Sequence, residues 1–315
     1  MDAALSGHAG ALHTQESARL TSRITALAVT VAVVLLGIKF AAWLVSGSVA
    51  MLASLADSGL DLVASIATFV AVRYAVVPPD EEHRFGHGKA EAFASLLQGV
   101  LVFTSAALIG REAIGHLLHP AALKSEGWAI LVMIASSLIV LGLIWLQGRV
   151  LARIKSVAVA GDRAHYLADV ASNMAALVGI GLAQWSGDTR WDAAAGLFVM
   201  GWLVWGAVGV LRESSHHLMD RELDEADRAR IIGLATADPQ VLGVHQVRTR
   251  ASGPYVHIQM HMDLEPDQTL DEAHKIVVAA ENRILAAFPA ADVLIHPDPC
   301  GRAETHGSGF FDRNA

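Results

Sequence analysis

The sequence predicts an α-helical membrane protein with six transmembrane helices, followed by a small α+β domain outside the membrane. Three observations support this fold class. Only 17% of the 315 residues are charged whereas 53% are hydrophobic, and an ordinary soluble domain has roughly 25% charged residues. Long apolar stretches fill the first two thirds of the chain, and charged residues become dense from about residue 212 onward.

Six stretches have about the 20 mostly apolar residues that a membrane-crossing helix needs. They are residues 24–45, 49–77, 91–115, 127–148, 157–185 and 191–211. We therefore expect a transmembrane domain over residues 19–212. The polar and small residues of 1–18 and 301–315 predict a disordered N-terminal arm and a disordered tail.

Residues 213–300 predict the α+β domain, because their hydrophobic periodicity changes along the chain. Residues 222–237 and 270–288 have helical periodicity, and residues 255–264 alternate between apolar and polar side chains, as a half-buried strand does. Residues 243–250 and 292–296 are further candidate strands. The predicted order is α-β-β-α-β.

The distribution of basic residues predicts the orientation in the membrane. Most Lys and Arg residues near the helix ends lie in the N-terminal arm and in the second-to-third and fourth-to-fifth connections. We therefore expect both termini in the cytoplasm and a multi-pass protein of the plasma (inner) membrane. The net charge of −8 and the lack of a basic run argue against a nucleic-acid partner.

Four ionisable residues interrupt the second and fifth apolar stretches. Asp57 and Asp61 are four residues apart, as are His165 and Asp169, so each pair lies on one face of a helix. Three carboxylates and one imidazole are a set that zinc can take tetrahedrally, and a bound cation would offset the cost of burying them. The alternatives are a proton path or a structural polar network. Lys39, the one basic residue deep in a span, cannot neutralise three acids.

Two further clusters lie outside the spans. Asp80, His83 and His87 fall in the second-to-third connection and fit a three-ligand metal site, although an exposed solvated loop is the alternative. In the predicted α+β domain the candidate ligands lie on or beside strands, with one on the intervening helix: His245, His261, His296, Asp298 and His274. His257 is a spare candidate on the same strand face as His261. We expect Cys300 to be a small buried thiol.

Four motifs together resemble the cation diffusion facilitator family. They are D-x-x-x-D in the second span, H-x-x-x-D in the fifth, "FGHGKAE" in the second-to-third connection and "IHPDPC" near the end. The chain is most similar to the bacterial ferrous-iron/zinc efflux branch. That resemblance implies a homodimer formed through cytoplasmic and transmembrane parts, proton-coupled export, and a metallochaperone-like cytoplasmic domain.

The resemblance also implies a role for each candidate residue. Asp57, Asp61, His165 and Asp169 match the transport site, and Asp80, His83 and His87 match a loop site. A binuclear cytoplasmic site is matched by His245, His261, His274, His296 and Asp298. Lys89 and Asp220 match an interdomain charge pair that ties the membrane part to the partner protomer.

These observations predict a secondary transporter that exports a divalent metal from the cytoplasm in exchange for protons. Zinc is the first choice of substrate, with iron(II) or cadmium as alternatives, and a manganese or cobalt carrier of the same family remains open. A membrane-bound metal sensor is a further alternative. A membrane metalloenzyme is disfavoured, because the spans contain no H-E-x-x-H helix and four protein ligands leave no open position on zinc.

Overall fold

The structure is a computed structural model that describes residues 14–47, 49–118, 127–187 and 190–302. The chain divides into two compact units on either side of the Ser215–His216 bond: a helical unit from Ala18 to Ser215, and a second unit that contains His216–Ala315. Each unit is described by itself.

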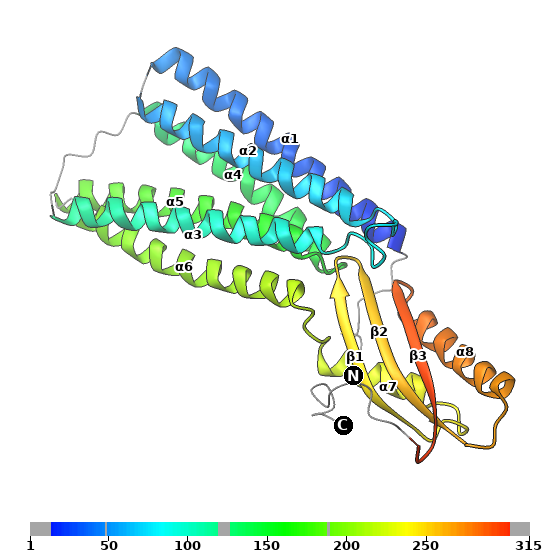
Figure 1. Cartoon of the computed structure of the whole chain (residues 1–315). Helices are drawn as coiled ribbons and strands as arrows, with labels where there is room; N and C mark the ends of the chain where they lie inside the picture. The colour runs from blue at the N-terminus through cyan, green and yellow to red at the C-terminus, as the bar shows by residue number, and fades with distance from the viewer. Residues whose placement is uncertain (1–13, 48, 119–126, 188–189, 303–315) are drawn as a thin grey trace, which may run out of the picture. The chain divides into compact units, whose positions relative to one another are not determined.

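The helical unit contains a helix at each of the six predicted spans (Figure 1). They are α1 (Thr14–Ser46), α2 (Val49–Ala75), α3 (Ala90–Leu118), α4 (Gly127–Leu151), α5 (Val157–Ser186) and α6 (Arg190–Leu218). Within the described residues, all except α5 are long and apolar enough to cross a membrane by composition alone. Helix α5 is the exception, and it carries Asp162, Arg163 and Asp169.

Helix α5 lies at the centre of the packing in the helical unit. One face packs with α1 and α4 through buried side chains that include Ala28, Leu143 and Tyr166. Another face packs with α3 and α6 through Val102 and Leu203, among others. A helix that is covered on several sides need not be apolar all round, so α5 can carry polar groups that a lipid-facing helix could not.

The helix boundaries correct two predictions. The predicted disordered arm extends to residue 18, but α1 already begins at Thr14; the rest of that arm and residues 303–315 of the predicted tail lie outside the described residues. Helix α6 continues to Leu218, past the predicted domain boundary at 212. The hydroxyls of Ser214 and Ser215 donate to the carbonyls of Val210 and Leu211, four residues earlier. These polar residues therefore bond within the helix rather than ending it.

The second unit confirms the predicted α-β-β-α-β order. Its elements are α7 (Glu225–Ala235), β1 (Gly243–Ser252), β2 (Tyr255–Leu264), α8 (Leu270–Ala287) and β3 (Ala291–Pro299). The sheet has the order β1-β2-β3, with β1 antiparallel and β3 parallel to β2. Ile258, Met260 and Met262 on β2 are buried with Ile284 of α8 in the core of this unit, so the strict alternation in the sequence marks the core face as predicted.

The register of the sheet aligns three histidines. His245 on β1 pairs with His261 on β2, and His261 pairs in turn with His296 on β3. Side chains at paired positions of neighbouring strands lie on the same face of a sheet. The row of histidines is therefore a direct consequence of strand pairing.

A capping box starts α8. The Thr269 side chain accepts from the Glu272 backbone N–H, and the Glu272 carboxylate accepts from the Thr269 backbone N–H at 2.8 Å. Donation to the Glu272 carboxylate by the Thr269 hydroxyl, at 2.7 Å, and by the Thr269 backbone N–H holds the pKa of Glu272 below its ordinary value of 4.5. The stabilising contribution of these bonds is therefore present above that value and is lost as the pH falls through the lowered pKa.

Replacing Thr269 by alanine is expected to destabilise the first turn of α8 by about 1 kcal/mol, because an N-terminal backbone donor loses its acceptor. Hydrogen–deuterium exchange of the full chain should then be faster at the start of α8. Thr269→Ser keeps the hydroxyl and should exchange as the wild type does. Equal exchange in the alanine variant and the wild type would show that the cap contributes no stability.

Candidate metal sites

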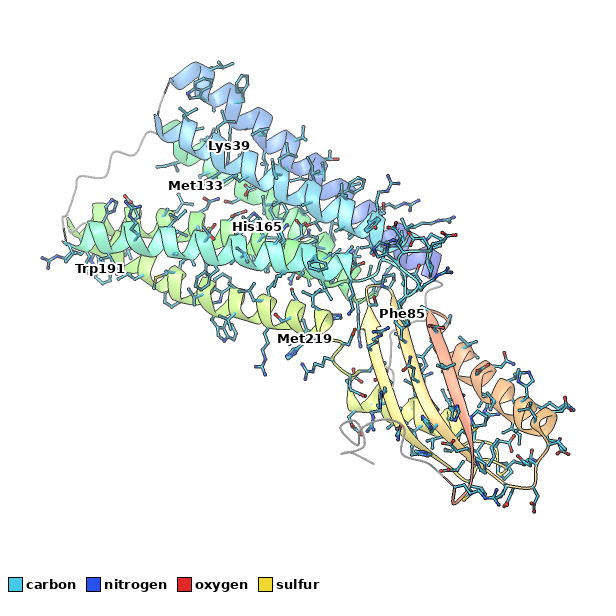
Figure 2. All side chains as sticks on the ribbon, in the orientation of Figure 1. Lys39, Phe85, Met133, His165, Trp191 and Met219 are labelled. Carbon is cyan, nitrogen blue, oxygen red and sulfur yellow. The ribbon has the colours of Figure 1, made fainter. Side chains whose placement is uncertain are left out.

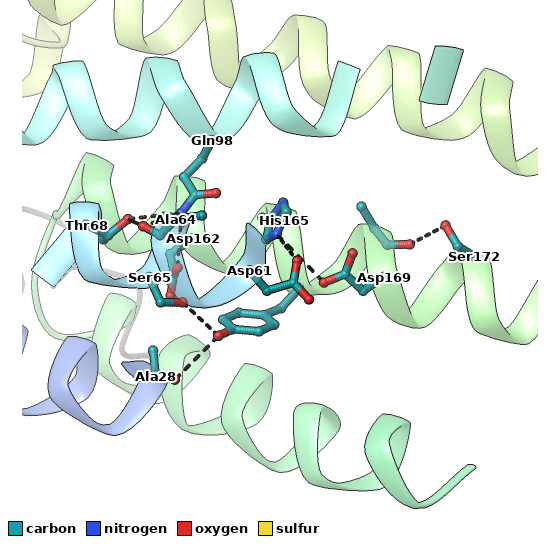
Figure 3. Close-up of polar contacts among 12 residues, drawn as sticks. Ala28, Asp61, Ala64, Ser65, Thr68, Gln98, Asp162, His165, Asp169 and Ser172 are labelled. Carbon is teal, nitrogen blue, oxygen red and sulfur yellow. Dashed lines mark hydrogen bonds and ion pairs between the residues drawn. The ribbon is translucent and has the colours of Figure 1, made fainter. Parts of the chain in front are cut away.

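The first candidate site lies between α2 and α5 (Figure 3). Nε2 of His165 lies 3.0 Å from Oδ1 of Asp61 and 3.9 Å from Oδ2 of Asp169. Asp61 and His165 are 104 positions apart in sequence, so packing of α2 against α5 brings them together. One ligand atom from each of the three residues lies within 4.8 Å of the others, as a shared metal ion requires.

This site is inside the helical unit. Figure 2 shows His165 between the helices, whereas Trp191 lies at one end of the unit. The His165 side chain is only 7% exposed, and the Asp61 and Asp169 carboxylates are partly exposed. One imidazole nitrogen therefore faces two partly exposed carboxylates, and a cation can take the place of the proton between them.

Asp57, the fourth predicted member, does not belong to this three-residue group. It lies one turn before Asp61 on α2, and its side chain is exposed in the single chain. Lys39, which sequence reasoning considered as a counter-charge, donates from Nζ to the Ser54 carbonyl at 3.3 Å. The geometry thus brings together three of the four predicted ligands.

Sequence reasoning missed a second polar layer, one helical turn before His165. Asp162 is fully buried and accepts hydrogen bonds from Gln98 on α3 and Gln147 on α4. Ser65 on α2 bonds the Tyr166 hydroxyl at 2.8 Å (Figure 3). The signal that could have found Asp162 is its spacing, because residues three and seven positions before His165 and Asp169 share their face of the helix.

Two further contacts fix α5 against α3 near its start. The Ser156 hydroxyl, just before α5, donates to Oε2 of the buried Glu91 at 2.6 Å. Gly161 lies so close to Ser95 that an added Cβ would be 2.8 Å from its hydroxyl oxygen and 2.9 Å from its Cα. The helix that carries His165 and Asp169 is therefore held to α3 over its first two turns.

The second candidate site is in the connection between α2 and α3. Asp80, His83 and His87 each offer a ligand atom within 4.8 Å of the others, and their role as a metal site stays a prediction. Oδ2 of Asp80 lies 3.2 Å from Nε2 of His87, and Nδ1 of His87 lies 3.3 Å from the Val77 carbonyl oxygen. The backbone N–H of His83 bonds Asp80 and holds the pKa of this exposed carboxyl below 3.8, so it stays an anionic ligand well into the acidic range.

The third candidate site lies on the sheet of the second unit. His245, His261 and Asp298 form a three-ligand group. The Asp298 carboxylate is its centre: Oδ2 lies 2.8 Å from Nδ1 of His261 and 3.4 Å from Nε2 of His245, and Oδ1 lies 3.3 Å from Nε2 of His296. The parallel pairing of β2 with β3 places this carboxylate beside the histidine row.

The other residues predicted for this unit do not belong to the three-ligand group. His274 is exposed on α8 and is not a member of the three-ligand group. His257 pairs instead with Asp292, at 3.1 Å from Nδ1 to Oδ2. Cys300 was expected to be buried and is exposed, because it lies just beyond the end of β3 and outside the core.

The sequence analysis did not identify Asp263, which lies beside the third candidate site. Its Oδ2 lies 3.3 Å from Nδ1 of His245, on the side of the ring away from Asp298. A carboxylate in this position fixes the tautomer of a ligating histidine and leaves Nε2 free for a metal.

The predicted charge pair of Lys89 and Asp220 has its two members in different units and stays a prediction. Within the second unit, Asp220 accepts from the Arg250 guanidinium at 3.0 Å. It adopts a left-handed backbone conformation, with φ of 56°, between the end of α6 and the start of α7.

Replacing Asp298 by alanine is expected to lower the zinc affinity of the cytoplasmic candidate site by at least about 10-fold, because three histidines lose their shared carboxylate. Equilibrium zinc titration of the full chain measures the change. Asp271→Asn, on the exposed face of α8, serves as the matched control and should leave the affinity unchanged. Equal affinities in the Asp298 variant and the control would remove Asp298 from the site.

The structure thus defines a multi-span helical membrane protein with groups that could hold a metal ion between its helices and on a small α+β domain. Residues 25–219 match the family model of the cation efflux transmembrane domain, and residues 223–300 match that of the cation efflux protein cytoplasmic domain. The chain belongs to the cation efflux family, also called the cation diffusion facilitators.

Similar proteins extend over almost the whole chain. A protein named cation-efflux pump FieF from Klebsiella pneumoniae is 40% identical over 299 residues, which cover 95% of this chain and 99% of that protein. FieF from Cronobacter sakazakii is 40% identical, with coverage of 93% and 98%. A solved structure of CzrB in its Zn form is 27% identical and covers 27% of this chain and 99% of that chain, with a TM-score of 0.26.

Membership of this family defines the class of activity. Cation efflux proteins are membrane transporters and not enzymes, and the chain is accordingly a divalent cation efflux transporter.

Proposed function

We propose that this transporter exports zinc from the cytoplasm in exchange for protons, with iron(II) and cadmium as further substrates. The observation that carries the proposal is the group formed by Asp61, His165 and Asp169 between α2 and α5. A charged or polar cluster inside a membrane bundle is costly to maintain and marks an ion pathway.

The chemistry of the ligands favours zinc. Two carboxylate oxygens and one imidazole nitrogen suit zinc, which takes four such ligands in tetrahedral geometry. Asp57, one turn from Asp61, is the proposed fourth ligand and completes the set when the α2 side chains turn toward α5. Manganese prefers oxygen ligands, so His165 argues against a manganese carrier. The same ligand set distinguishes cobalt from zinc less clearly.

The same atoms provide proton exchange. Nε2 of His165 lies within reach of both carboxylates, so it either carries a proton that they stabilise or gives its lone pair to a metal. Metal binding requires the deprotonated nitrogen, so metal and proton compete for this position. Release of zinc on one side of the membrane and entry of protons from that side follow from this competition.

The remaining features of the proposal concern assembly and location. The excess of Lys and Arg in the N-terminal arm and in the two connections noted above supports cytoplasmic termini and an inner-membrane location. The match to the cytoplasmic domain of cation efflux proteins supports a homodimer. The loop and sheet clusters are proposed cytoplasmic metal sites, and metal shared among the sheet histidines would stabilise the paired domains.

The test is metal uptake by the full chain reconstituted into vesicles, with a panel of divalent ions and with or without an imposed pH gradient. We expect zinc flux that rises with an opposing proton gradient and is larger than manganese or magnesium flux. Binding of zinc without flux would favour a metal sensor. Flux that ignores the pH gradient would contradict proton exchange.

A further inference from the structure

Asp162 is a buried carboxyl group that the proposed metal site does not use. It has no solvent-accessible surface. Nε2 of Gln98 donates to its Oδ1 at 3.2 Å, and Nε2 of Gln147 donates to its Oδ2 at 2.7 Å. Hydrogen bonds from neutral amides stabilise an ionised carboxylate, and without such donors burial would favour the neutral acid.

The amide groups of Gln98 and Gln147 differ in the hydrogen bonds that orient them. Nε2 of Gln98 also donates to Oγ1 of Thr68 at 3.0 Å, which fixes its orientation (Figure 3). Nε2 of Gln147 contacts Asp162, and its Oε1 is buried without a hydrogen-bond partner among the described residues. Oε1 of Gln98 is likewise without a partner, but Gln98 has the bond to Thr68 in addition, whereas among the described residues only the bond to Asp162 orients the Gln147 amide.

Rotating the Gln147 amide by half a turn would provide a hydrogen-bond acceptor for the neutral form of Asp162. The turn brings Oε1 to the position of Nε2, where it can accept the O–H of the protonated acid. The separation of 2.7 Å is typical of an O–H···O bond and also allows a short N–H···O bond to a carboxylate. Since either orientation leaves one amide atom without a partner, the cost to Gln147 is about equal in the two states.

We propose that Asp162 is a proton-binding group of the membrane unit, and that Gln147 accommodates both of its protonation states by turning its amide. The inference rests on the proposed metal–proton exchange and deepens it. It adds a proton acceptor that lies one turn away from the metal ligands and does not itself bind the metal.

The charges around Asp162 couple it to the metal site. Of the metal-site groups, His165 lies one turn later on the same helix, and Asp61 on α2 lies 3.0 Å from the His165 ring. From α3 and α4 the carboxylate meets amides, and α6 packs on α5 with apolar side chains such as Val199 and Leu203. A divalent cation bound at His165 and Asp61 adds positive charge on this side, so zinc arrival is expected to release the proton and zinc departure to allow its return.

Infrared difference spectroscopy of the full chain in zinc-saturated vesicles tests the proposal. Saturating zinc holds the metal-site carboxylates as ligands, and because zinc also opposes protonation of Asp162, the band is expected at a lower pH than in the zinc-free protein. We expect the C=O stretching band of a protonated buried carboxyl group to appear as the pH is lowered. The band should be absent in Asp162→Asn and retained in Glu91→Gln, the matched control for the other deeply buried acid.

Gln147→Met provides an independent readout if Asp162→Asn does not fold. It removes a donor that stabilises the ionised form more than the neutral one, so the band should appear at a pH about one unit higher. A band that persists in Asp162→Asn, or a midpoint unchanged in Gln147→Met, would overturn the proposal.

Zinc flux in the same vesicles separates this inference from the proposed function. Wild-type vesicles that move zinc but show no band from Asp162 would contradict the inference alone. Vesicles that show the band but move no zinc would contradict the proposed function alone. Where both hold, Asp162→Asn should still move zinc, with fewer protons exchanged per zinc ion.

Discussion

Replacing His165 by alanine is expected to lower zinc flux in reconstituted vesicles by at least about 100-fold. Nε2 of His165 is the atom that both Asp61 and Asp169 approach, so its loss removes a ligand and leaves two partly buried carboxylates facing each other. Changes to residues that merely orient metal ligands already cost about 10- to 100-fold in affinity or activity. The initial rate of zinc entry, measured with a fluorescent indicator inside the vesicles, gives the result.

His116→Ala is the matched control for this prediction. His116 lies in the last turn of α3, and its Nε2 pairs with Glu112 at 3.2 Å, away from the proposed site. This variant should transport zinc at the wild-type rate. Retained flux in His165→Ala, with the control behaving as expected, would show that zinc does not pass through this site.

Replacing Gly161 by valine is expected to have the largest effect on folding of the helical unit. Even a Cβ at this position would lie 2.9 Å from the backbone Cα of Ser95, and a backbone atom cannot move aside as a flexible side chain can. Overpacking of this kind typically costs 1–3 kcal/mol, and here it would push apart α3 and α5. Thermal unfolding of the full chain in detergent should begin at a lower temperature.

Gly142→Ala on α4 is the control for Gly161. An added Cβ there meets nothing within 4 Å, and alanine is the better helix former. Its unfolding temperature should equal or exceed that of the wild type. If Gly161→Val unfolds at the same temperature as Gly142→Ala, α3 and α5 do not pack as closely as the structure shows.

The sequence predicted the elements well because their signals are local. Each apolar run of about 20 residues became a helix, and the alternation along residues 255–264 became β2 with the expected face in the core. The clusters at Asp80 and at His165 could also be predicted, since their members are close in sequence or follow helical spacing. Helix ends were less predictable, because hydroxyls such as those of Ser214 and Ser215 satisfy helix carbonyls and extend α6 past the apolar run.

The parts that could not be predicted depend on contacts between distant segments. The partners of Asp162 come from two different helices, α3 and α4, and no local pattern indicates that Gln98 and Gln147 converge on it. Similarly, the pairing of β2 with β3 decides that Asp298, rather than His274 on α8, shares the site with His245 and His261. Helix and strand periodicity fix which face a residue occupies, but not which residue faces it.

Simultaneous recording of zinc and pH inside vesicles that contain the full chain tests the central claim most directly. The claim is that one set of atoms between α2 and α5 binds either zinc or protons. It predicts that protons leave the vesicle as zinc enters and that both movements disappear in His165→Ala. Zinc entry without proton movement, or proton movement that survives the loss of His165 while zinc entry stops, would contradict it.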